Sequence, residues 1–124
     1  MEMRFFRCRK CGQMAALIRA SKCPVCCCGE PMEELIAGTT EASREKHIPV
    51  LEVRDGRAYV TVGSVPHPMI EEHYIEWIAL STTEGNQRKA LAPGQEPKAV
   101  FPLLPGEEAR AVYAYCNLHS LWKA

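Results

Sequence analysis

Cysteines crowd the beginning of this chain. Six of the seven lie within the first 28 residues, and the seventh, Cys116, is near the other end. A segment this short cannot fold on an apolar core alone, because below about 40 residues a domain usually needs a disulfide or a metal. An odd cysteine count without a secretion signal argues against a disulfide framework. The sequence therefore predicts a small metal-stabilised domain.

Composition excludes several other classes. Lysine plus arginine balance aspartate plus glutamate at 15 each, whereas a nucleic-acid-binding protein normally carries a basic excess. The longest apolar runs, 14–18 and 77–80, are too short to cross a bilayer, and the N-terminus lacks the apolar core of a signal peptide. We expect a cytoplasmic protein that binds neither nucleic acid nor membrane.

The chain divides into three parts. Residues 1–36 hold the cysteine cluster and two short predicted strands, 14–18 and 32–36. Residues 37–44, AGTTEASR, are small and polar and are interpreted as a linker. Residues 45–124 are predicted to form a second domain.

The second domain has the pattern of an antiparallel sheet. Asp55-Gly56 between two alternating runs predicts a hairpin, because glycine tolerates the positive φ of a tight turn. No segment shows convincing helical periodicity. Strands are predicted at 50–54, 57–63, 74–80, 87–91, 99–103, 109–115 and 119–123. About seven short strands separated by turn residues predict a β-sandwich.

The cysteine spacing indicates a four-sulfur metal site. Cys8-x-x-Cys11 supplies the first pair of thiolates. Cys23-Pro-Val-Cys26 repeats this spacing, whereas an adjacent pair such as Cys27-Cys28 would distort the site. Spacing alone favours the repeat as the second pair. It does not separate iron from zinc, since four sulfurs suit both metals.

A second group of candidate ligands lies at predicted loop–strand boundaries, where the loops of a sandwich gather. Its members are His47, His67, His73, Cys116 and His119. Five ligands exceed the four of a structural zinc and suit an octahedral iron with one open position. An axial thiolate would donate electron density toward that position, so a small oxygen species could bind there and accept an electron. The alternative is a set of unrelated histidines and a free buried cysteine.

Six motifs occur in order from Cys8 to Ala124. They are CRKCG, CCGEPM, EKHIPV, GSVPHPM, HYIEWIAL and YCNLHSLWKA. Together they resemble the desulfoferrodoxin family of superoxide reductases. The resemblance implies an all-β homodimer in which a rubredoxin- or desulforedoxin-like iron domain, 1–36, precedes an immunoglobulin-like antiparallel β-sandwich, 45–124, with the catalytic iron.

The resemblance also implies two ligand sets. The catalytic iron would have four equatorial histidines and an axial cysteine trans to the open position, namely His47, His67, His73, His119 and Cys116. The N-terminal iron would be held by Cys8, Cys11, Cys27 and Cys28. Cys23 and Cys26 then become extra thiols, in conflict with the inference from spacing, and zinc stays an alternative to iron at this site.

Two residues beside the first histidine complete the implied active site. Glu45 can occupy the open position of the oxidised iron, and Lys46 attracts superoxide and organises protons. A protein without net charge needs such a local cation, because a positive group focuses the field that draws in a small anion.

The implied reaction is the one-electron reduction of superoxide, which with two protons gives hydrogen peroxide. Ferrous iron would supply the electron, and a rubredoxin-like external donor would reduce the iron again. One alternative is a superoxide dismutase, which needs no donor. Others are a non-enzymatic iron electron-transfer or metal-binding module and a zinc-ribbon regulator.

Overall fold

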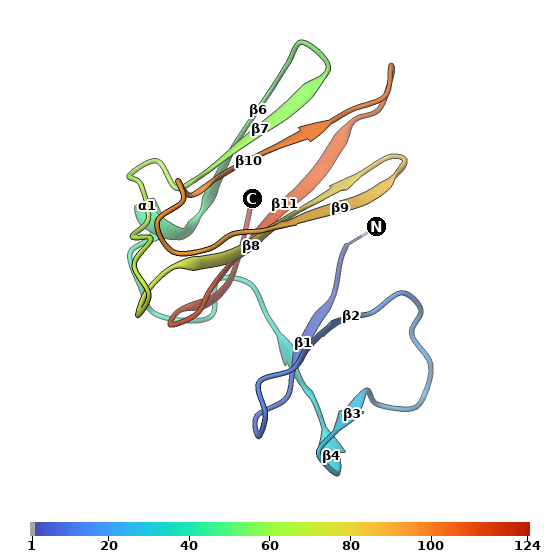
Figure 1. Cartoon of the computed structure of the whole chain (residues 1–124). Coiled ribbons are helices and arrows are strands. Elements are labelled where there is room, and N and C mark those ends of the chain that lie inside the picture. Colours follow the sequence, from blue (N-terminus) through green and yellow to red (C-terminus); the bar gives the residue numbers. More distant parts are fainter. Residues whose placement is uncertain (1) are drawn as a thin grey trace. The chain divides into compact units, whose positions relative to one another are not determined.

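The computed structural model describes residues 2–124 and is built almost entirely of antiparallel strands (Figure 1). The chain forms two compact units, Met1–Ile36 and Ala37–Ala124. The expected all-β class is confirmed. Within residues 2–124, the structure contains no helix with the length and apolar character that a membrane span requires.

The first unit consists of very short strands. They are β1 (Phe5–Arg7), β2 (Met14–Ala16), β3 (Cys26–Cys27), β4 (Glu30–Pro31) and β5 (Glu33–Leu35). The order β2-β1-β5 makes one sheet, and β3 pairs with β4 in a second. The two strands predicted here, β2 and β5, are both present but shorter than expected.

The core of the first unit is small. Phe6, Cys8 and Met32 form its buried apolar cluster, with a few half-buried neighbours. Because a fully buried side chain contributes only about 1.5–3 kcal/mol, a cluster of this size does not offset the conformational entropy of some 36 ordered residues. The unit therefore needs the metal that its cysteines predict.

The second unit is a sandwich of two antiparallel sheets. Its strands are β6 (Pro49–Arg54), β7 (Arg57–Val62), β8 (Ile75–Thr82), β9 (Gly85–Ala90), β10 (Lys98–Pro102), β11 (Ala109–Cys116) and β12 (Ser120–Lys123). One sheet has the order β10-β7-β6, and the other has the order β12-β11-β8-β9. The predicted sandwich of about seven strands is confirmed.

The core of this unit lies between the sheets. Alternation along β7 turns Ala58, Val60 and Val62 inward, where they join apolar side chains of β8, β10 and β11. Phe101 and Ile78 are fully buried in this cluster. This packing makes a rigid base for the loops at the strand ends.

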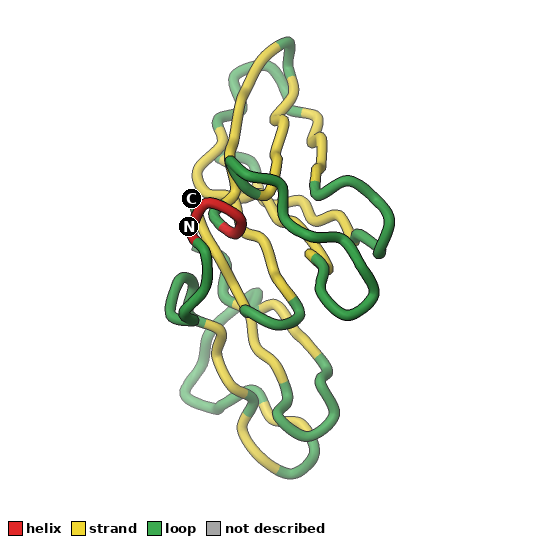
Figure 2. The backbone as a smooth tube through the Cα atoms, turned by 90° about the vertical axis from the view of Figure 1, so that its left-hand side faces the viewer, coloured by secondary structure: helices red, strands yellow, loops and turns green. Residues whose placement is uncertain are grey.

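One element was not expected from the sequence. Among residues 2–124, α1 (Arg44–His47) is the one helix, a single turn just before β6 (Figure 2). The segment interpreted as a linker, 37–44, is part of the second unit, and the Gly38 amide donates to the Leu121 carbonyl at 2.9 Å. A single turn is too short to show a helical period, which explains why the sequence did not predict it.

Candidate metal centres

Four sulfurs converge in the first unit. The Sγ atoms of Cys8, Cys11, Cys27 and Cys28 all lie within 4.8 Å of one another. Cys8 directly follows β1, and its sulfur accepts the backbone N–H of Cys11 at 3.5 Å. Gly12, at φ 80°, closes this turn. We call this group the four-sulfur centre.

The adjacent cysteines share the centre because the chain reverses at them. Cys27 pairs with Glu30 across β3 and β4, and Cys28 and Gly29 form the two-residue turn between them. Both turn residues have positive φ, 52° and 77°, as in the tight hairpins that match strand twist. The reversal places the sulfurs of Cys27 and Cys28 3.9 Å apart.

The other two cysteines stay outside this group. Cys23 and Cys26 are exposed, and the Cys26 sulfur faces the Pro24 carbonyl at 3.7 Å. Cys26 and Cys27 are successive residues of β3, so their side chains leave the strand on opposite faces. The structure thus brings together the pair that the resemblance implied and leaves apart the pair that spacing favoured.

The close approach of the four thiols indicates that the group fits a cation. The Cys11 amide chiefly lowers the pKa of Cys8 to about 6, which favours the thiolate. Hydrogen bonding to Cys11 and Cys8 raises the pKa of Cys27 to about 12. Four thiolates this close repel one another unless a positive ion lies among them, so full ionisation requires a metal.

Removing the outer thiols tests this assignment. Replacing Cys23 and Cys26 together by serine should leave the first metal bound, with a content within about 10% of the parent protein, because neither sulfur belongs to the group. Metal per chain after exhaustive dialysis is the measurement. The matched Cys27 and Cys28 double variant should lose that metal. The opposite pattern would assign the centre to the outer pair.

A second group of donors converges in the sandwich. The ligand atoms of His47, His67, His73 and Cys116 lie within 4.8 Å of one another. The fourth histidine joins them, because Nδ1 of His119 lies 3.1 Å from Nε2 of His47 and 3.8 Å from the Cys116 sulfur. All five predicted ligands are therefore neighbours. We call this group the histidine centre.

Backbone hydrogen bonds orient two of these rings. Nδ1 of His47 lies 2.6 Å from the Ser43 carbonyl oxygen, and Nδ1 of His67 lies 2.7 Å from that of Pro68. A carbonyl only accepts, so each Nδ1 carries the proton and each Nε2 presents a lone pair. The two Nε2 atoms are 3.1 Å apart, as expected of nitrogens that share a metal.

The histidine centre also fits a metal by its electrostatics. Burial lowers the pKa of His67 to about 4. Burial is likewise the main reason why the pKa of His73 is lowered, and the charges of His119 and Lys46 add to it. The His67 and His73 rings are therefore neutral donors near pH 7. Nε2 of His73 is buried and has no hydrogen-bond partner within residues 2–124, a cost that a bound metal would remove.

Three separate connections supply the ligands. His47 ends α1, His67 and His73 lie between β7 and β8, and Cys116 and His119 flank the turn from β11 to β12. Cys116 is fully buried, and burial raises the pKa of its thiol. The thiol must therefore release a proton when a metal binds.

A glycine missed by the sequence analysis brings two of these connections together. A Cβ on Gly63 would lie 2.5 Å from the Glu45 carbonyl oxygen, so no larger residue fits there unless the backbone shifts. The same oxygen accepts the Val65 amide at 2.9 Å and the Ser64 hydroxyl at 3.2 Å. The loop to His67 is thus fastened to α1. Gly63 ends a predicted strand, which was its one signal in the sequence.

Glu45 and Lys46 lie on α1 immediately before His47, and both side chains are exposed. Glu45 contributes its carbonyl to the loop contacts described above. The Lys46 charge is the smallest of the causes that lower the pKa of His47, after burial and the charges of His119 and His73.

Comparisons with known proteins agree with this architecture. A family model described as desulfoferrodoxin matches residues 39–124. A desulfoferrodoxin homolog from Archaeoglobus fulgidus is 42% identical over 122 residues, which cover 98% of this chain and 96% of that protein. The desulfoferrodoxin of Nitratidesulfovibrio vulgaris is 43% identical over 121 residues, which cover 96% of this chain and 93% of that protein.

Solved structures extend the likeness to the whole fold. The superoxide reductase from Treponema pallidum covers 100% of this chain and 99% of its own, with a TM-score of 0.85 and 36% identity. A one-iron superoxide reductase from Giardia intestinalis has a TM-score of 0.55 and 35% identity, and matches 64% of this chain and 95% of its own. With its sequence, fold and two donor groups in agreement, this chain belongs to the desulfoferrodoxin family.

Proposed function

We propose that this protein is a superoxide reductase that converts superoxide, two protons and one electron into hydrogen peroxide. The observation that carries the proposal is the histidine centre, in which four imidazoles and one buried thiol converge. Iron bound there would supply the electron, and its affinity for imidazole and thiolate fits this donor set. The superoxide reductases among its structural neighbours support the same reaction.

The surrounding residues would do the remaining work. Cys116 is fully buried, so its sulfur is shielded from water and from competing oxidants. The exposed Lys46 side chain on α1 would attract the anion and hold protons at Nζ for the product. Glu45 beside it would provide a carboxylate for the open position after oxidation.

The catalytic cycle would need an electron donor. We propose a rubredoxin-like one-electron donor as the partner and a homodimer as the working form, in the cytoplasm. The first unit, residues 1–36, would hold the other iron at the four-sulfur centre, with zinc as its alternative, and residues 45–124 would hold the catalytic iron.

Product stoichiometry tests the proposed reaction. A reductase forms one hydrogen peroxide for each superoxide consumed, releases no oxygen and needs a reductant. A dismutase forms one peroxide and one oxygen from two superoxides. Pulse-generated superoxide with a peroxide assay and an oxygen electrode separates the two. Oxygen release at half the superoxide consumed would assign a dismutase, and loss of superoxide no faster than in buffer would leave only a metal-binding module.

The charge of Lys46 gives a quantitative prediction. Lys46→Ala should slow the bimolecular reaction with superoxide on the order of tenfold, because one charge near the site contributes about 1.4 kcal/mol. Arg44→Ala removes the same charge from the same helix and is the matched control, with an expected effect under about twofold. Pulse radiolysis at low ionic strength measures both rates.

Salt separates steering from a structural effect. The parent rate should fall as salt rises, and the Lys46→Ala rate should fall less, because screening acts on the attraction that the substitution removes. Two results would show that Lys46 does not steer the substrate. One is an equal salt dependence of the superoxide rate in both proteins, and the other is a Lys46→Ala protein that reacts as fast as the parent protein at low salt.

A further inference from the structure

A tryptophan touches two of the candidate ligands. The Trp122 indole packs against the His47 ring, with centroids 4.9 Å apart and planes inclined by 31°. Its Nε1 donates to the backbone carbonyl of His119 at 2.9 Å. Trp122 is only 2% exposed, so the protein covers its side chain almost completely. One side chain therefore links α1 to the turn between β11 and β12.

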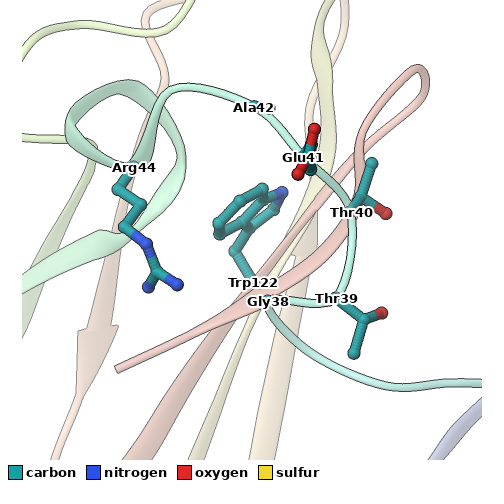
Figure 3. Close-up of a pocket in the computed structure, with 7 residues that line it drawn as sticks. All are labelled: Gly38, Thr39, Thr40, Glu41, Ala42, Arg44 and Trp122. Atoms are coloured by element: carbon teal, nitrogen blue, oxygen red, sulfur yellow. The ribbon is translucent and has the colours of Figure 1, made fainter.

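The segment before α1 surrounds this indole. Trp122 lines a cavity of about 470 Å³ whose other walls come from 38–42 and Arg44. Figure 3 shows the chain from Gly38 to Ala42 curving around the ring, with the Arg44 side chain on another side. The Gly38 amide bonds to the carbonyl of Leu121, the residue before Trp122. The segment that leads into α1 is thus bonded to β12 at the residue next to the indole.

These contacts restrict the motions that would separate the two ligands. The hydrogen bond from His47 Nδ1 to Ser43 fixes one ring atom but leaves rotation about it, and a flat indole beside the ring limits that rotation. The bond to the His119 carbonyl fixes the backbone that carries the other ring. Such outer contacts of metal ligands commonly change metal affinity by about 10–100-fold when they are lost.

We propose that Trp122 is a positioning residue of the histidine centre, which holds His47 through its ring face and His119 through its N–H. This inference rests on the proposed function only in requiring a metal at that centre. Tryptophan suits the role because it offers a broad apolar face and one donor on the same rigid group. Phenylalanine would keep a ring face without the donor, and leucine would keep neither.

The chain contains a matched control. Trp77 is the other tryptophan, lies in the same sheet on β8 and is 8% exposed. Its ring stacks on Tyr115 at 5.6 Å rather than on a candidate ligand. Trp77→Phe therefore reports the loss of a buried indole from this sandwich without the loss of a contact to a ligand ring.

The test follows iron release from the full-length, iron-loaded protein into a chelator. The phase that is missing from a His47→Ala protein belongs to the histidine centre, and the four-sulfur centre serves as an internal standard. We expect apparent affinity at the histidine centre to fall about tenfold in Trp122→Phe and up to about a hundredfold in Trp122→Leu. Trp77→Phe should change it by less than about twofold.

Two further readouts separate positioning from general destabilisation. The midpoint temperature of thermal unfolding of the metal-free protein should be lowered in both Trp122→Leu and Trp77→Phe. Only the Trp122 variants should also lose metal faster. The fluorescence of Trp77→Phe, in which Trp122 is the remaining tryptophan, should be quenched when the histidine centre fills. Iron release from the Trp122 variants at the rate of Trp77→Phe would overturn the inference. If the variants lose iron as predicted here but the parent protein does not reduce superoxide, only the proposed function is overturned.

Discussion

Replacing His47 by alanine should empty the histidine centre and leave the four-sulfur centre filled. Nε2 of His47 lies 3.1 Å from Nε2 of His67 and 3.1 Å from Nδ1 of His119. The ring is 2% exposed, so its removal leaves a cavity that the neighbouring donors do not fill. Losing a direct ligand should cost more than the roughly 10–100-fold typical of an outer contact. Iron should fall from about two atoms per chain to about one.

Activity should follow the metal in that variant. Turnover of superoxide should fall to the rate in buffer, because no other described donor group places imidazoles and a thiol together. Arg44→Ala changes the other end of the same helix and should keep both metals. Two atoms of iron per chain in purified His47→Ala would show that His47 is not a ligand.

Replacing Cys8 by serine should unfold the first unit and spare the second. Cys8 belongs both to the four-sulfur centre and to the buried cluster of that unit, so the substitution removes a ligand and part of the core. In small metal-dependent domains the binding free energy, about 10–16 kcal/mol for zinc-finger peptides, is also the folding free energy. Without it, residues 1–36 should be digested by a protease while the sandwich resists.

The size of the resistant piece makes this result specific. Mass spectrometry should find a fragment that begins near Ala37, where the first unit ends, and this fragment should hold one iron and react with superoxide. Cys23→Ser is the control and should stay intact under the same digestion. Loss of both metals from Cys8→Ser would show that the two units depend on each other. A fragment that begins near Thr40 should be less stable, because it lacks Gly38 and the hydrogen bond from Gly38 to Leu121.

The sequence predicted the sandwich well because its signals are local. The Asp55-Gly56 hairpin is present, and both residues have positive φ, 51° and 70°. Strand β8 extends two residues beyond its predicted end, because Thr82 still pairs with Gly85. Strands β1, β3 and β4 have two or three residues each, too few for an alternating pattern to be seen.

The ligand groups were harder to derive from residues alone. Counting residues cannot reveal the reversal at Cys28 and Gly29, so spacing favoured Cys23 and Cys26 where the structure gathers the adjacent pair. The histidines come from connections far apart in sequence, and their meeting depends on strand register. Residue type and position indicated a metal, but the 3.1 Å separations needed the fold.

The Glu45 carbonyl has a consequence for how the histidine centre moves. It binds the Val65 amide and the Ser64 hydroxyl, so α1 and the loop to His67 form one mechanical body. His47 and His67 should then travel together during thermal fluctuations, and their separation should stay nearly constant. Cys116 and His119 belong to a different hairpin. Thermal motion at the site is therefore expected mainly between two pairs of ligands. His47 and His67 form one pair, and Cys116 and His119 form the other.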